Sequence, residues 1–200
     1  MAYFVTTPQI GVAGLNAVYT SGLLGFPWVS ATVNPLPSAA IEEMFGQIIS
    51  AQSTDTTVGG GGEFIFLQIP TSTTVTPGLF YTWDGAYKIA VVATTQASQA
   101  NSGRPIALAI NTVSSNGTSN QATWFQVQGR GTALRSTFTT LNVQPNIPLY
   151  VSAATAGRIR STASVFRTII GLRSANVATV ASNVSTLLVY LNRPNIGPGI

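Results

Sequence analysis

From Glu63 onward, apolar residues alternate with polar ones along short segments, and turns containing Gly or Pro separate these segments. A period of two is the spacing of side chains that share one face of a β-strand. The segments recur at roughly 8–12 residues, which is typical of a β-sandwich or a β-barrel. We therefore predict an all-β, sandwich or barrel-like domain. The predicted strands lie at 64–69, 79–83, 87–92, 106–110, 123–128, 132–138, 149–152, 158–160, 168–172 and 187–191.

Two of the turns carry distinct signals. The Asp-Gly pair at 84–85 predicts a tight two-residue hairpin, because both residue types tolerate a positive φ. The Gly-Arg-Gly segment at 129–131 predicts a second turn with Arg130 at its tip. Loop tips often contact partners, although a solvated arginine is an equal alternative there. In the strand before this turn, Trp124 and Phe125 point to opposite faces, so alternation places one or the other of them in the core.

One segment, 38–51, has the pattern of a helix. Ser38 is a suitable N-cap, and Glu42 and Glu43 in the first turn suit the helix dipole. Gly46 weakens the middle of the segment. We expect the apolar stripe to cover the open side of a sheet in its own subunit or, alternatively, to contact a second subunit. The stripe follows helical spacing through Ile41, Met44, Phe45, Ile48 and Ile49.

These patterns divide the chain into three parts. We expect residues 1–61 to form an N-terminal arm with one or two short strands and the helix, 62–191 to form the β domain, and 192–200 to form a Pro/Gly-rich tail. In the arm, Phe26 and Trp28 flank a proline and form an apolar anchor for a partner, unless Trp28 packs on the core of its own domain.

The composition limits what chemistry the chain can perform. Cys and His are both absent and Lys occurs once, which excludes thiol catalysis, a Ser-His-Asp triad and His-ligated metals. Acid–base catalysis needs groups that move protons, and these are scarce here. We expect a protein that is not an enzyme and binds no cofactor or metal. Its five carboxylates are Glu42, Glu43, Asp55, Glu63 and Asp84.

The charges are separated along the sequence. All five acidic residues lie before residue 85 and all nine basic residues lie from Lys88 onward, for a net charge of +4. The arginines occur singly and without interleaved aromatic runs, so we do not expect nucleic acid as a partner. They either keep a β domain soluble or contact an acidic protein surface, such as the acidic half of a second copy.

The N-terminus lacks a basic region followed by a continuous apolar run, so no secretory signal is predicted. No segment approaches the ~18 apolar residues of a membrane-spanning helix, and we expect no membrane contact.

Several short motifs follow one another in a distinctive order. They are GEFIFL at 62–67, YTWDGAY at 81–87, GRPIALA at 103–109, WFQVQG at 124–129, PLYVSAATAG at 148–157, IIGL at 169–172 and LLVYLNRP at 187–194. This order resembles that of the head decoration, or cement, proteins of tailed bacteriophages, as found in marine and cyanobacterial phages. The resemblance covers about residues 62–194 and leaves out the N-terminal 60. The turn after Ala-Thr-Ala-Gly is normally acidic in these proteins, whereas this chain has Arg158 and Arg160 there.

The resemblance implies a non-enzymatic virion structural protein. Proteins of this family bind the outer surface of the expanded phage capsid, often as homotrimers, and clamp neighbouring major capsid subunits. They are assembled in the host cytoplasm. The partners expected here are therefore the phage major capsid protein and further copies of the chain. The candidate contact residues are Phe26, Trp28, Arg130, Arg158, Arg160 and Arg193.

Two alternatives remain at the level of sequence. A tail, fibre or baseplate component would share the β-rich pattern, but it would show longer fibrous repeats. A carbohydrate-binding β-sandwich would present clustered exposed aromatic residues. The tryptophans at 28, 83 and 124 are dispersed in the sequence and give no such signal.

Overall fold

The computed structural model shows an almost entirely β architecture, without a helix in the residues that it describes. These are residues 3–5, 19–20, 29–30, 44–53, 61–94, 103–115, 117, 120–136, 141–161, 168–175, 178–180 and 185–197. The strands are β1 (Tyr3–Val5), β2 (Tyr19–Thr20), β3 (Val29–Ser30), β4 (Ile48–Ser53), β5 (Gly61–Ile69), β6 (Phe80–Trp83), β7 (Ile89–Val91), β8 (Ile106–Ala109), β9 (Gln121–Leu134), β10 (Leu141–Val143), β11 (Pro148–Val151), β12 (Ile159–Arg160), β13 (Thr168–Ser174), β14 (Ala178–Val180) and β15 (Thr186–Ile196).

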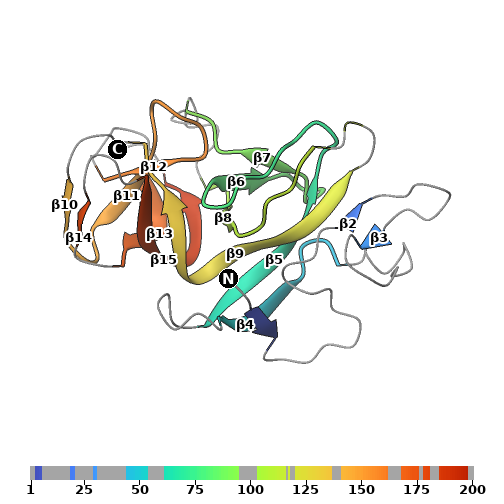
Figure 1. The fold of residues 1–200 in the computed structure, drawn as a ribbon, viewed down its shortest axis with the longest axis horizontal. Coiled ribbons are helices and arrows are strands. Elements are labelled where there is room, and N and C mark those ends of the chain that lie inside the picture. Colours follow the sequence, from blue (N-terminus) through green and yellow to red (C-terminus); the bar gives the residue numbers. More distant parts are fainter. Residues whose placement is uncertain are drawn as a thin grey trace.

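The fourteen-residue strand β9 organises the sheet. One of its edges pairs with β5, and the other pairs in turn with β2, β8 and β15. The main path runs β1-β4-β5-β9-β15-β13-β11-β12, and each neighbouring pair along it is antiparallel. In Figure 1, β9 crosses the molecule from the β2 end to the orange and red strands of the C-terminal half.

The first half of β9 belongs to a curled segment with β5, β6, β7 and β8. The curl brings Lys88, just before β7, into a parallel bridge with Gln68 of β5. The Gln68 amide also donates a 3.0 Å hydrogen bond to the carbonyl of Tyr87. Alternate residues of the five strands point inward and form one apolar core together with Val75 and Val113, which bridge to each other outside these strands. Its buried members are Ile65, Leu67, Ile69, Val75, Tyr81, Ile89, Ala107, Ala109, Val113, Phe125 and Val127.

The second half of β9 belongs to another curled segment with β15, β13, β11 and β12. A parallel bridge joins Arg135, just after β9, to Ile159 of β12. The outward faces of β6 and β8 close this second core, so the two curled segments share a wall. The buried members of the core are Phe80, Val92, Ile106, Leu108, Ala133, Leu149, Val151, Ile159, Ile169, Leu172, Leu187, Val189, Leu191 and Ile196.

A cluster of aromatic rings covers the other face of β5 and β9. Phe66 stacks on Phe45 with ring centroids 5.8 Å apart, and it also contacts Trp124 at 5.0 Å. Trp124 and Phe125 lie on opposite faces of β9, and both side chains are fully buried in the interior. Such pairs add to the free energy gained by burying their apolar area.

The structure confirms the all-β class as a curled antiparallel sheet, a half-barrel, but it does not confirm a sandwich. Each predicted strand from 64 onward corresponds to an observed one, although two of them are merged in β9. The strands β10 and β14 were not predicted, and they pair only with each other.

The predicted turn at 129–131 is wrong, and Arg130 does not lie at a hairpin tip. The segment lies inside β9, where Gly129 has a φ of 105° and the pairing with β5 shifts register between Glu63 and Phe64. Glycine at positive φ bends the strand here instead of ending it. On the edge of β9 that faces away from β5, the pairing partner then changes from β8 at 125–126 to β15 from 128 onward.

The predicted helix at 38–51 is wrong for the part that the structure describes. Residues 44–46 form a turn and 48–51 belong to β4, whereas 38–43 lie outside the described residues. Ile48 is exposed and Ile49 is buried, which is the alternation of a strand. The pair Ile48–Ile49 is compatible with the helical spacing of 3.6 residues and with the strand spacing of two. The segment becomes a strand because it pairs with β5 over five residues. Gly46, at a φ of 80°, ends the turn.

The Asp-Gly hairpin exists, but its turn is longer than predicted. Trp83 pairs with Ile89, so five residues separate the paired positions of β6 and β7. The residue at positive φ is Tyr87, at 58°, and not Gly85. The Asp84 side chain stabilises the loop, because its Oδ1 atom accepts hydrogen bonds from the amides of Ala86 and Lys88, both 2.9 Å long.

The boundaries of the three expected parts differ from the observed elements. Strands β1 and β4, from the expected arm, pair within the main sheet. At the other end, β15 continues to Ile196 and includes the first five residues of the expected tail. Residues 198–200 lie outside the described residues.

Candidate interaction surface

The carboxylates of the described residues have structural partners. Asp84 caps its own loop, as described above. Glu63 in β5 forms an ion pair with Arg193 in β15, with an Oε2–Nη2 distance of 2.8 Å, and Arg193 Nε donates to the same oxygen at 2.9 Å. The Arg193 side chain is 62% exposed, so water and salt screen this pair.

Arg130 and Tyr190 begin a row of side chains on the outside of the second curled segment. They are directly opposed in the β9–β15 ladder, and the Arg130 guanidinium carbon lies 5.5 Å from the centre of the Tyr190 ring. Val189 and Leu191 point into the core, so Tyr190 must point outward, and its side chain is 47% exposed. A guanidinium at this distance from a tyrosine ring forms a cation–π interaction.

Arg173 continues the row on the next strand. It is paired with Tyr190 across the β13–β15 ladder and is exposed, because its neighbours Leu172 and Ser174 take the buried positions. Arg173 Nη1 donates a 2.8 Å hydrogen bond to the carbonyl of Asn146, which holds the side chain along the sheet. Arg130, Tyr190 and Arg173 therefore lie side by side on three neighbouring strands of the sheet, β9, β15 and β13.

A second arginine–tyrosine pair lies on the far strands of the same segment. Tyr150 of β11 is opposed to Arg160 of β12, and the flanking residues Leu149 and Val151 are buried in the core. We call the set Arg130, Tyr150, Arg160, Arg173 and Tyr190 the arginine–tyrosine face. The Nε atoms of Arg130 and Arg160 are buried without a hydrogen-bond partner among the described residues.

Arg158 has a different role. Its Nη1 atom donates a 3.1 Å hydrogen bond to the carbonyl of Arg135, which fixes the chain after β9 to the strand β12. Arg135 itself is buried, and burial lowers the pKa of its guanidinium from the ordinary value. Both residues therefore stabilise the closure of the second curled segment.

The structure places the predicted contact residues in different environments. Arg130 and Arg160 lie on the arginine–tyrosine face, Arg158 binds the chain internally, and Arg193 is paired with Glu63. The other two, Phe26 and Trp28, lie outside the described residues.

Three members of the face were not identified from the sequence: Tyr150, Arg173 and Tyr190. A signal for Tyr190 was present, because it takes an outward position between two buried residues of a strand with clear alternation. Nothing in the sequence indicated that Tyr190 lies close to Arg130 and Arg173. These residues are far apart in sequence and meet only through the strand order.

The arginine–tyrosine face presents three guanidinium groups and two phenol groups. Among the residues of the structure described above, no group of His, Cys, Asp and Glu is placed to hold a metal ion. In that same part of the chain, no helix combines the length and the apolar character needed to cross a membrane. Guanidinium and phenol groups on a rigid sheet are suited to contact an acidic surface.

We compared the chain with protein-family models, with curated proteins and with solved structures, and none of the three comparisons gave a match.

Proposed function

We propose that the protein is a non-enzymatic virion structural protein that binds the outer surface of a phage capsid and cements neighbouring major capsid subunits. The observation that carries the proposal is the cross-strand row of Arg130, Tyr190 and Arg173 on the outside of a curled sheet. The order of motifs from 62 to 194, which resembles that of head decoration proteins, supports the capsid as the partner.

The residue types of this row suit a protein interface. Arg and Tyr are enriched among interface residues whose removal costs the most binding free energy. Here the Tyr190 ring lies against one guanidinium, and a backbone carbonyl holds the Arg173 guanidinium. Both side chains are ordered before binding, so binding costs less conformational entropy than it would for free arginines.

The charge of the face defines its partner. The chain has no Asp or Glu after residue 84, and Glu63 is already engaged by Arg193. The face therefore keeps a positive potential, and the complementary surface on the capsid subunit is acidic. Repetition of one such contact around a homotrimer and over a capsid lattice would multiply a modest single affinity.

The test compares two charge reversals in co-sedimentation with purified expanded capsids of the encoding phage. Arg173→Glu reverses a charge on the face, and Lys88→Glu reverses an exposed charge on the hairpin loop away from it. We expect Arg173→Glu to weaken binding at least about tenfold and Lys88→Glu to change it less than about twofold. Light scattering of the free protein gives its mass, with a trimer expected.

The proposal fails if the folded wild-type protein does not co-sediment with capsids. A stable monomer that does not bind capsids would instead favour a tail, fibre or baseplate component or a carbohydrate-binding domain. Equal loss of binding in both variants would contradict the role of the arginine–tyrosine face, because a general effect of net charge would then explain the binding.

A further inference from the structure

A cavity of about 150 Å³ lies where β6 ends and β8 begins. Three of its lining side chains, Ile65, Ile106 and Val127, are buried, whereas Ile48 is 42% exposed. The cavity therefore has an apolar interior and opens to solvent beside Ile48. The one charged residue that lines it is Arg193 of β15. A dry protein cavity of about this volume holds benzene, so there is room for one ring.

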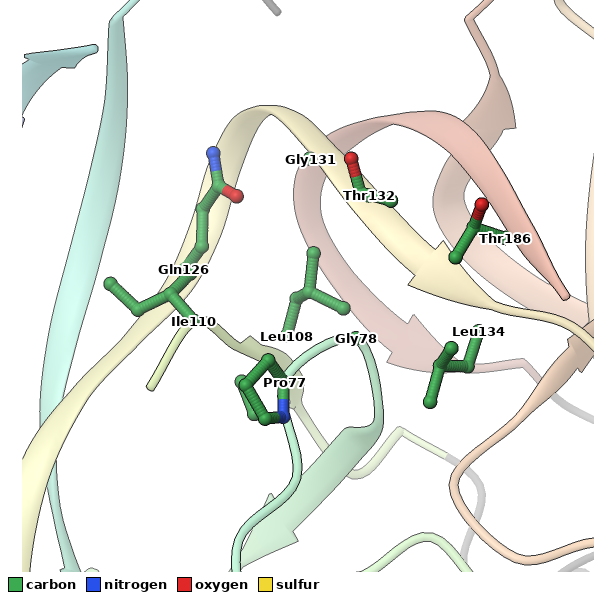
Figure 2. Close-up of a pocket in the computed structure, with 10 residues that line it drawn as sticks. Pro77, Gly78, Leu108, Ile110, Gln126, Gly131, Thr132, Leu134 and Thr186 are labelled. Atoms are coloured by element: carbon green, nitrogen blue, oxygen red, sulfur yellow. The ribbon is translucent and has the colours of Figure 1, made fainter. Parts of the chain in front are cut away.

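Figure 2 shows a second cavity, of about 250 Å³, between the bend of β9, the end of β8 and the loop at 77–78. None of its lining residues is charged. An uncharged apolar ligand can enter either cavity, because both interiors are mainly apolar. An anionic group on the ligand distinguishes the two cavities, because Arg193 lines the smaller one.

A bulge in β15 positions Arg193. Leu191 and Pro194 are buried, and the two residues between them, Asn192 and Arg193, are both exposed. The regular alternation of the strand is interrupted where its pairing with β13 shifts register around Gly171, and Arg193 takes a φ of 44°. Pro194 therefore becomes part of the cavity wall, and Arg193 lies at the edge that faces solvent.

The guanidinium of Arg193 keeps donors that the fold does not use. Its Nε and Nη2 atoms both donate to Oε2 of Glu63, at 2.9 and 2.8 Å. A guanidinium has five N–H donors, so both N–H groups of Nη1 remain. They have no hydrogen-bond partner among the described residues, and the side chain is 62% exposed. These donors are therefore accessible to a ligand at the mouth of the cavity.

The charges beside the cavity favour an anion. Arg104 is exposed and immediately precedes a lining residue, and its carbonyl accepts a 3.0 Å hydrogen bond from the end of β15. The carboxylates of Glu63 and Asp84, which adjoin lining residues, are already engaged by Arg193 and by two amides of the hairpin loop. An anionic ligand at the mouth therefore meets two guanidinium groups and carboxylates that have partners.

We propose that this cavity binds a small carboxylate that carries a single apolar ring. The ring fills the apolar interior, and the carboxylate accepts hydrogen bonds from Nη1 of Arg193. Charge-assisted hydrogen bonds of this kind are about twice as strong as those between neutral groups. A larger ring system does not fit, because pockets for drug-sized ligands begin at about 300 Å³. This inference does not rest on the proposed function.

The first experiment compares phenylacetate with phenylacetamide, which has the same shape without the charge. Binding is followed by NMR on the full chain, with the indole N–H of Trp83 as the probe of this cavity and the amide of Gly131 as the probe of the larger one. We expect phenylacetate to shift the Trp83 signal and to bind about three- to fivefold more tightly than the amide, with a smaller ratio in about 0.5 M salt. No binding of phenylacetate, an affinity no higher than that of the amide, or shifts confined to Gly131 would overturn the proposal.

Two variants then assign the preference to Arg193. Arg193→Gln should bind both ligands equally, whereas Glu63→Gln should bind phenylacetate about two- to fivefold more tightly than wild type, because it removes a competing carboxylate. Both residues are at least partly exposed and their pair contributes little to stability, so both variants should fold. Affinity for phenylacetamide is the internal control and should stay constant. A retained preference in Arg193→Gln, or no gain in Glu63→Gln, would contradict the proposal.

A third variant tests the location of the ring. Ile48→Trp places a larger side chain at the mouth of the cavity without removing a buried group, and Ile170→Trp is the matched control at another exposed isoleucine, which does not line the cavity. We expect folded Ile48→Trp to lose at least about tenfold in affinity for both ligands and Ile170→Trp to keep the wild-type affinity. Unchanged affinity in Ile48→Trp would show that the ligands bind elsewhere and would overturn the assignment of this cavity.

Discussion

The ring of Tyr87 occupies the space that a side chain on Gly46 would need. A Cβ atom built on Gly46 would lie 2.3 Å from Tyr87 Cε1. Both residues have positive φ angles, 80° for Gly46 and 58° for Tyr87, and both segments bond to β5. The Gly46 amide donates to the carbonyl of Phe66, and the Gln68 amide donates to the carbonyl of Tyr87. Two chain segments 41 positions apart thus meet over one strand.

We predict that Gly46→Ala destabilises the protein. A residue with a Cβ costs about 1–2 kcal/mol in the left-handed region, and the Tyr87 ring must also move. The matched control is Gly85→Ala, because Gly85 lacks a positive φ and has nothing within 4 Å of a built Cβ. Urea unfolding should show a lower free energy of unfolding for Gly46→Ala alone. Similar values for the two variants would contradict the prediction.

Asp84 should matter through its oxygen and not through its charge. Its Oδ1 atom accepts two hydrogen bonds from backbone amides of the hairpin loop. Asp84→Asn keeps an acceptor oxygen, whereas Asp84→Ala removes it. We expect a loss of about 1–2 kcal/mol in the free energy of unfolding for the alanine variant and less than half of that loss for the asparagine variant. Equal losses would assign the effect to charge.

The ion pair between Glu63 and Arg193 should contribute little to stability. Its arginine is largely exposed, and pairs of this kind contribute about 0.2–1 kcal/mol. A double-mutant cycle with Glu63→Gln and Arg193→Gln measures the coupling free energy. We expect a value in this range that declines in about 0.5 M salt. A coupling energy that is independent of salt would show that the pair is shielded from solvent.

We expect the free energy of unfolding to depend on pH in the alkaline range because of Tyr81. Burial raises the pKa of its phenol above 10.0, and the hydrogen bond from the amide of Thr76 opposes this shift only in part. The unfolded chain therefore releases this proton at a lower pH than the folded chain does. The stabilisation is complete below pH 10 and declines as the pH rises through the raised pKa.

The corresponding measurement is the free energy of unfolding between about pH 8 and pH 11, for wild type and Tyr81→Phe. The variant also loses the hydroxyl group, which donates to the carbonyl of Thr74 at 3.3 Å, so its stability at neutral pH is the reference. We expect a weaker decline with pH in Tyr81→Phe than in wild type. Parallel curves would show that Tyr81 ionises alike in the folded and unfolded states.

The strands were predictable because burial leaves a period of two in the sequence. The segment at 187–191 is an example, where Leu187, Val189 and Leu191 are buried and alternate with outward residues. The error at 38–51 has the opposite origin. Apolar residues there fit a helical spacing, and only the hydrogen bonds offered by β5 decide that 48–51 is a strand.

Two of the five residues of the arginine–tyrosine face were predictable from the sequence. Arg130 and Arg160 were proposed as contact residues from their positions in the sequence, but Arg130 was assigned to a turn. Glycine is compatible with a turn and with a bend inside a strand, and the sequence pattern of 129–131 is the same for both. Continuous pairing of β9 with β15 after Gly129 settles the choice.

The sequence by itself determined the β class, the approximate position of the strands from 64 onward and the separation of acidic from basic residues, because these depend on the order of residue types alone. The tertiary structure decided which strands are neighbours. Backbone groups form the same hydrogen bonds with any strand, and burial of the core selects the register. That register brings Arg130, Tyr190 and Arg173 together and buries the side chain of Gln126.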